Sequence, residues 1–207
     1  TSALASFVPD VAVTYTLNLT VNVELDQAVD MLTVTVLDPM PQLEGDIVIT
    51  DVMSDPSVLG DSIGEWFEVL NPTNTTWNLK DCDLTDLDSD YAPIDGTLVI
   101  RPGAYVTLAR SANPGFAPDF VYSGYALGNS GDEILFNCAG KEVAQVPMLT
   151  VFGFPANAPT GVSLGLLRSS IDETANDVGA NWCESTSDYN GDKGTPGAPN
   201  EYQNACP

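Results

Sequence analysis

The sequence predicts an all-β protein, built as a sandwich or a barrel of short strands. Short runs of β-branched and aromatic residues recur at close spacing, and Gly, Pro, Asn and Asp separate them. No segment keeps the period of about 3.6 residues that an amphipathic helix requires, and Ser169–Asn176 could supply one helical turn at most. The chain of 207 residues is long enough to bury a substantial core.

The clearest strand candidates of the middle region end at turn-forming residues. They are Ile47–Met53, Trp66–Leu70, Thr97–Ile100, Tyr105–Ala109, Glu133–Phe136 and Val143–Val146. In the second of these, Trp66, Val69 and Leu70 are expected to pack inward. The two acidic residues there, Glu65 and Glu68, are expected to face outward or to cap a turn.

The most regular pattern in the chain lies near its start, in Val13–Leu25. Polar residues alternate there with the apolar residues Val13, Tyr15, Leu17, Leu19, Val21, Val23 and Leu25. A period of two predicts a β-strand with one buried face. At about 3.3 Å per residue this strand would reach roughly 40 Å, about twice the usual length.

A second β-rich run, Leu32–Leu37, follows after a turn and could form a hairpin with the first strand. Pro39 and Pro41 then close the segment as a linker. We therefore expect residues 1–45 to form an N-terminal β extension and residues 46–207 to form a β-sandwich. The long strand either pairs within its own chain or is donated to a neighbouring copy, which would make the protein a homo-oligomer.

The charge balance excludes some partners. The chain carries 29 acidic and six basic residues, a net charge of −23, and no Lys or Arg precedes Lys80. Such a surface repels phosphate backbones, so nucleic acid is excluded as a partner. No apolar run is long enough to span a bilayer as a helix.

The four cysteines indicate disulfide bonds. They are Cys82, Cys138, Cys183 and Cys206, with no C-x-x-C pair among them and no His in the chain to complete a zinc site. Four cysteines can form two disulfides in three different ways. In the sequential one, Cys82–Cys138 would staple the middle of the chain and Cys183–Cys206 would fix the Gly- and Pro-rich C-terminus. Disulfides form in oxidising compartments, so we expect a secreted, extracellular or cell-surface protein.

Two acidic stretches are calcium candidates, because hard oxygen ligands in alternation suit Ca²⁺. The first offers Asp86, Asp88 and Asp90, and the second offers Asp188, Asn190 and Asp192. Neither has Glu at the twelfth position of a calcium loop, since Thr97 and Pro199 stand there. Solvated acidic loops are the alternative explanation. No other cofactor is expected.

An ordered series of motifs adds a family resemblance. The motifs are Asp46–Met53, Gly64–Pro72, Trp77–Leu79, Ile100–Tyr105, Leu127–Asp132, Asn181–Cys183 and Gly194–Asn200. In this order they resemble the lamin-tail domain of secreted bacterial proteins, over about residues 46–200. The resemblance implies an immunoglobulin-like β-sandwich, to which the N-terminal long strand or hairpin is an addition. It also implies a structural or interaction module and carries no catalytic residue.

The residues themselves argue against an enzyme. A chain without His lacks the Ser-His and Cys-His nucleophile pairs, and no glycine-rich phosphate loop is present. Two functions therefore remain. One is a self-assembling surface or filament subunit whose N-terminal strand joins the copies. The other is a monomeric secreted adhesion or binding module that could depend on calcium.

Overall fold

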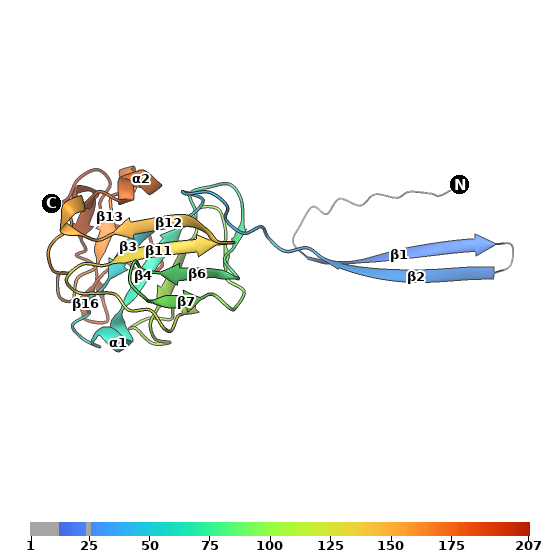
Figure 1. The fold of residues 1–207 in the computed structure, drawn as a ribbon, viewed down its shortest axis with the longest axis horizontal. Helices are drawn as coiled ribbons and strands as arrows, with labels where there is room; N and C mark the ends of the chain where they lie inside the picture. Colours follow the sequence, from blue (N-terminus) through green and yellow to red (C-terminus); the bar gives the residue numbers. More distant parts are fainter. Residues whose placement is uncertain (1–12, 24–25) are drawn as a thin grey trace. The chain divides into compact units, whose positions relative to one another are not determined.

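The computed structural model describes residues 13–23 and 26–207 and divides the chain into two compact units, Thr1–Pro39 and Met40–Pro207 (Figure 1). The second unit thus begins before Asp46, the residue at which the sequence pattern placed the sandwich. Local contacts explain the earlier start. Pro41 is buried, the carboxylate of Asp46 accepts hydrogen bonds from the backbone N–H groups of Gln42 and Leu43, and Gly45 N–H donates to Val143 O.

The first unit contains one antiparallel hairpin, β1 (Thr14–Val23) and β2 (Asp26–Thr35). The hairpin that the sequence allowed is confirmed. The expected turn before Leu32 is wrong, because β2 already begins at Asp26 and pairs residue for residue with β1. Leu25 lies outside the described residues.

The second unit is a sandwich of two main sheets (Figure 1). The six-stranded sheet has the order β10-β9-β4-β3-β13-β14, and the four-stranded sheet has the order β12-β11-β6-β7. The strands of the larger sheet are β3 (Val48–Met53), β4 (Trp66–Leu70), β9 (Tyr105–Ala109), β10 (Phe120–Val121), β13 (Leu164–Leu166) and β14 (Trp182–Glu184). Those of the smaller sheet are β6 (Cys82–Thr85), β7 (Tyr91–Pro93), β11 (Glu133–Cys138) and β12 (Lys141–Pro147).

Shorter elements complete the unit. Two more pairs of strands are β5 (Trp77–Asn78) with β8 (Val99–Ile100), and β15 (Asp188–Tyr189) with β16 (Asp192–Lys193). The helices are α1 (Asp61–Gly64) and α2 (Glu173–Asn176), with 3₁₀ turns at Thr150–Phe152, Arg168–Ser170 and Gly179–Asn181. Among the described residues, no helix is long and apolar enough to cross a membrane.

The core lies between the two sheets. Strand β11 shows the pattern clearly: Ile134, Phe136 and Cys138 are buried while the residues between them are half-buried. Phe67 and Val69 of β4 supply the opposite layer and belong to the same apolar cluster. The all-β class, the sandwich and the strand bounds of β4 and β9 are therefore confirmed.

The outer face of the six-stranded sheet is also covered, by the segment that follows β14. Trp66 stacks edge-on against Phe116 and Tyr189, and its indole N–H donates to the Tyr189 hydroxyl at 2.8 Å. Gly194 lies against this cluster, where a Cβ would come within 3.0 Å of the Trp66 ring. Both faces of β3 and β4 are therefore covered, and every residue of these two strands is buried.

Both edges of the four-stranded sheet, β12 and β7, are occupied. Along β12, Gln145 O accepts a hydrogen bond from the Asn176 side chain of α2 and Val143 O accepts one from Gly45 N–H. At the opposite edge, Tyr91 N–H of β7 donates to Gly124 O, and Pro93 has no N–H to offer. Edges covered in this way resist pairing with another chain.

Candidate functional site

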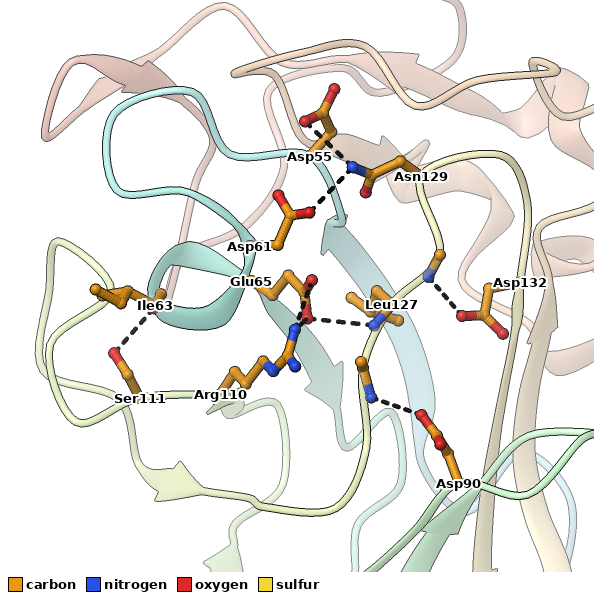
Figure 2. Close-up of polar contacts among 12 residues, drawn as sticks. Asp55, Asp61, Ile63, Glu65, Asp90, Arg110, Ser111, Leu127, Asn129 and Asp132 are labelled. Atoms are coloured by element: carbon orange, nitrogen blue, oxygen red, sulfur yellow. Dashed lines mark hydrogen bonds and ion pairs between the residues drawn. The ribbon is translucent and has the colours of Figure 1, made fainter.

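Figure 2 shows a cluster of polar contacts where β4 begins. The Glu65 side chain is only 1% exposed, and the Nη1 of Arg110 donates to both of its carboxylate oxygens at 3.1 Å. Leu127 N–H donates to the same carboxylate at 3.2 Å. The sequence expectation that Glu65 faces outward is wrong, because the end of β9 brings a guanidinium to it and the chain after β10 closes over it.

Burial raises the pKa of Glu65 to about 7, although the Leu127 N–H and the positive charge of Arg110 both favour the ionised form. The two hydrogen bonds fix the position of the Arg110 guanidinium beside the Glu65 carboxylate. Arg110 remains 32% exposed, so its guanidinium reaches solvent while its partner does not.

Three acidic residues around this pair organise the surrounding loops (Figure 2). Asp90 accepts a hydrogen bond from Ala126 N–H at 2.9 Å, and Asp132 accepts one from Gly128 N–H at 2.6 Å. The side-chain amide of Asn129 donates to Asp61 at 3.2 Å. The acidity of this region is therefore used in part to satisfy backbone and side-chain donors rather than to bind a ligand.

A second pair of buried acids lies on the outer face of the larger sheet. Asp51 and Glu68 are both 0% exposed and are direct cross-strand partners. Asp51 accepts from the Thr195 hydroxyl at 3.1 Å, while Glu68 accepts from Gly197 N–H at 2.7 Å. Glu68 was expected to face outward or to cap a turn. It is not exposed, since residues 195–198 cover the face on which it lies, and its carboxylate instead accepts a hydrogen bond from the turn at Gly197.

Burial raises the pKa of Asp51 to about 7 and that of Glu68 to about 9. For Glu68, the nearby charge of Asp51 adds to the increase. Asn200 completes the attachment of this segment, because its amide donates to Thr50 O at 2.6 Å and to Leu166 O at 2.9 Å. The motif Gly194–Asn200 is thus a clasp that holds the C-terminal segment on the sheet.

The two calcium candidates form turns in the structure. In the first, Asp86 accepts hydrogen bonds from Asp88 N–H at 3.0 Å and Asp90 N–H at 2.9 Å. In the part of the chain that the structure describes, no three His, Cys, Asp or Glu residues are grouped so that they could hold a metal ion. The calcium sites stay a prediction.

The second stretch is divided among different contacts. Asp188 forms an ion pair with Lys193, and Asn190 takes a positive φ of 47° in the turn between β15 and β16. Asp192 is buried and accepts hydrogen bonds from the Ser57 hydroxyl and from Val58 N–H. The side chains of Asp188 and Asp192 therefore serve two separate interactions, and Asn190 shapes the turn through its backbone.

The N-terminal hairpin gathers most of its apolar side chains on one face, which also carries Asp30 beside Leu19, whereas the exposed Val29 and Met31 lie on the opposite face. Cross-strand pairing sets Leu17 beside Leu32 and Val21 beside Ala28. This face was expected to be buried, but Leu19 is 64% exposed, and Val21 and Leu32 are also exposed. Among the residues of this unit that the structure describes, the two-stranded sheet has no second layer to cover this face. The Val13 side chain is exposed as well, and that of Val23 lies outside the described residues.

The cysteines form the sequential connectivity. Cys82–Cys138 joins residues that are directly opposite on β6 and β11, and Cys183–Cys206 ties the C-terminal end to β14. Two disulfides are consistent with an extracellular protein.

Comparison with known families agrees with this architecture. The lamin tail domain model matches residues 41–149. The match spans more than half of the chain, so this protein belongs to the lamin tail domain family, which is a family of immunoglobulin-like binding or structural modules. The motifs at Asn181–Cys183 and Gly194–Asn200 lie beyond the matched range. No curated protein matches the chain.

Sequence reasoning missed the partner of Glu65. Arg110 follows β9 directly and meets Glu65 because β9 pairs with β4 in antiparallel register, with Ala109 opposite Trp66. The one available signal was scarcity: with only six basic residues in the chain, an Arg at the end of an apolar strand is notable.

Proposed function

We propose that this protein is a structural subunit of an extracellular assembly and that its N-terminal hairpin joins one copy to the next. One observation carries this proposal: the ten-residue strands β1 and β2 form a two-stranded sheet whose apolar face is exposed. An isolated hairpin is marginally stable in water, and a third strand or a packed layer makes it stable. Assembly would supply both.

The burial of this face favours association energetically. Fully burying one Leu or Val side chain contributes about 1.5–3 kcal/mol, so covering Leu19, Val21 and Leu32 contributes several kcal/mol. The same face on a second copy has the complementary chemistry. No Lys or Arg occurs in the first 79 residues, so salt bridges between hairpins do not contribute. The contact is apolar except at Asp30, which lies beside Leu19 on this face.

Which sheet edges are open determines which surfaces of two copies can pair. The two edges of the four-stranded sheet are occupied by Gly45, Asn176 and Gly124. The hairpin is a sheet of two strands, so each of them is also an edge. Pairing of hairpins through both edges would extend the sheet from copy to copy, whereas pairing of faces alone would close as a dimer.

Light scattering and electron microscopy of the intact chain test the proposal. The intact protein is expected to form oligomers or filaments that grow with concentration, and a chain lacking residues 1–39 is expected to be monomeric. Because residues 40–207 form a separate compact unit, the shortened chain should keep its fold.

A matched pair of point variants locates the contact. Leu19→Lys places a charge on the apolar face and is expected to prevent assembly. Thr16→Lys places the same charge on the opposite face, at the end where Thr16 pairs with Thr33, and should leave assembly intact. An intact chain that stays monomeric at high concentration would overturn the proposal and favour the monomeric binding module.

A further inference from the structure

The outer faces of the two main sheets differ in how they are covered. Residues 188–200 lie over the outer face of the six-stranded sheet and bury Glu68. On the four-stranded sheet, Leu135 of β11 points to the outer face, because its neighbours Ile134 and Phe136 belong to the core. Leu135 is only half-buried. Within residues 40–207, this face is therefore less covered than the other.

An open groove of about 170 Å³ lies on this outer face. Its apolar walls are Leu135 of β11, Pro147 of β12, Leu87 from the loop after β6, and Leu149 and Phe152 from the segment after β12. Leu87 is 71% exposed and Phe152 is 45% exposed, so both present apolar surface to solvent. The volume lies below the range of about 300–1,000 Å³ for small-molecule sites and suits one large side chain of a peptide.

Carboxylates stand at two places beside the groove. Glu133 of β11 and Asp177, which follows α2, both line it. Burial raises the pKa of both carboxyl groups, that of Asp177 to about 6, and neighbouring negative charges add to the increase. These neighbours are Asp132, Asp88 and Asp86 for Glu133, and Glu173, Glu142 and Glu44 for Asp177. The two sets share no residue, so negative charge is concentrated at two separate places.

No basic residue that the structure describes forms an ion pair with these acids. In residues 13–23 and 26–207, the ion pairs are Glu65–Arg110 and Asp188–Lys193, and neither involves a member of the two sets. Interfaces place groups of opposite charge against each other and bury apolar side chains at their centre. The groove therefore complements a segment that has an apolar side chain with cationic side chains before and after it.

A second copy of this chain does not offer such a segment. Its six basic residues are spread out, and the two nearest in sequence, Arg101 and Arg110, are nine positions apart. With a net charge of −23, a second copy would also bring more negative charge to the groove. Both edges of this sheet are occupied, by Gly45, Asn176 and Gly124, so side chains rather than strand addition would hold the segment. The occupant is therefore a different protein.

We propose that this groove binds an extended segment of another protein in which one Phe, Leu or Trp lies between Lys or Arg residues. The apolar side chain enters the groove beside Leu135, Leu149 and Phe152, and the basic side chains lie near the acids around Glu133 and Asp177. An apolar anchor in a pocket supplies most of the binding energy of such contacts. This site belongs to the sandwich and does not depend on assembly through the hairpin, so either proposal can fail alone.

Fluorescence anisotropy of peptides that carry the same dye tests the site on the intact protein. The probes are Lys-Lys-Phe-Lys-Lys, Lys-Lys-Leu-Lys-Lys and Lys-Lys-Trp-Lys-Lys, and the controls are Lys-Lys-Ala-Lys-Lys and Glu-Glu-Phe-Glu-Glu. At least one probe is expected to bind about tenfold more tightly than the Ala peptide, which net charge alone attracts. The acidic peptide should not bind.

Two matched pairs of variants locate the contact. Phe152→Ser removes an exposed wall of the groove and should weaken the tightest probe about tenfold, whereas Val151→Ser, 81% exposed but outside the groove, should leave it unchanged. Glu133→Gln removes one carboxylate at the groove and should weaken binding about threefold. Glu184→Gln makes the same change at an exposed position on β14 and should have no effect.

Three outcomes would overturn the proposal. The first is that no probe binds more tightly than the Ala peptide. The second is that Phe152→Ser and Val151→Ser change binding equally, which would place the apolar contact outside the groove. The third is that Glu133→Gln and Glu184→Gln have equal effects, since the attraction would then come from the net charge of the chain rather than from the acids at this site.

Discussion

Asp51 on β3 and Glu68 on β4 stand directly opposite each other, and both carboxyl groups are buried beneath residues 195–198. A β-bulge between Ile49 and Asp51 creates this pairing by shifting the register of β3 by one residue. Two carboxylates so close cannot both ionise without cost, so the pair retains at least one proton at neutral pH. The clasp over the sheet is therefore sensitive to pH.

We predict that the protein becomes less stable as the pH rises from 5 to 9. The folded pKa values, about 7 for Asp51 and about 9 for Glu68, lie above the ordinary values of 3.8 and 4.5. Between those limits the folded state binds more protons than the unfolded state, so the free energy of unfolding falls with pH. Each retained proton makes the free energy of unfolding fall by about 1.4 kcal/mol per pH unit, so the expected loss is several kcal/mol. Guanidinium denaturation at each pH measures it.

Asp51→Asn is the matched control for that titration. Its amide oxygen can still accept from Thr195, and its NH₂ group takes the place of the Asp51 oxygen that has no partner. The variant should show a flatter dependence of stability on pH. An unchanged slope would mean that the dependence arises elsewhere, for example at Glu65 or Asp177, whose pKa values burial also raises.

Removing the two partners of the Glu65–Arg110 pair should have unequal effects. Arg110→Met leaves a buried carboxylate without its cation and is expected to cost about 3–5 kcal/mol. Glu65→Gln leaves Arg110 one-third exposed to water and keeps an acceptor for Leu127 N–H, so it should cost about 1–2 kcal/mol. Denaturation of both variants and of the double variant measures the asymmetry. Equal costs would contradict the burial of Glu65.

Loss of the C-terminal disulfide should destabilise the sandwich without unfolding it. Replacing Cys183 and Cys206 by Ser opens a loop whose ends are 23 residues apart, which corresponds to about 3 kcal/mol by chain entropy. The clasp formed by Asp51, Glu68 and Asn200 is expected to hold residues 194–200 in place. Limited proteolysis should therefore cut after Asn200 in this variant and spare Gly194–Asn200.

Gly179 should tolerate no side chain. A Cβ at this position would lie 2.3–2.5 Å from backbone atoms of Gly153 and Phe154, and these atoms cannot move aside as a side chain would. Gly179→Ala is expected to cost more than about 2 kcal/mol in stability. Gly96→Ala is the control, since a Cβ there would have nothing within 4 Å of it and the φ of Gly96 is not left-handed. Comparable melting temperatures for the two variants would disprove this packing.

The local sequence pattern was sufficient to predict strands of the sandwich and the N-terminal hairpin. Trp66–Leu70 and Tyr105–Ala109 were predicted with the bounds that the structure has, because β-branched and aromatic residues end there at turn residues. The pattern misplaced the start of β2, since Asp26, Gln27 and Asp30 resemble turn residues. Regular pairing with β1 outweighs that local preference, as in the pair Leu19 and Asp30.

The burial that the local pattern did not predict arises where segments distant in sequence cover one another in the fold. Because acidic residues flank Trp66 and Phe67, the pattern favoured outward positions for Glu65 and Glu68, and nothing nearby in sequence indicates that residues 188–200 cover the second face of this strand. The burial of Glu65 has the same origin. It arises because β10 runs parallel to β9 and brings the loop after it over Glu65. Such meetings of distant segments leave no periodic signal.

The Cys183–Cys206 bond also has a mechanical consequence. If the domain is pulled by the segment before β3 and by Cys206, the disulfide transmits the force from Cys206 directly to β14. The clasp residues between Cys183 and Cys206 then carry little of the force. Only β13 separates β14 from β3, and it pairs antiparallel with both. The force between β3 and β14 therefore passes through the residue pairs that β13 makes with each of them rather than through the clasp.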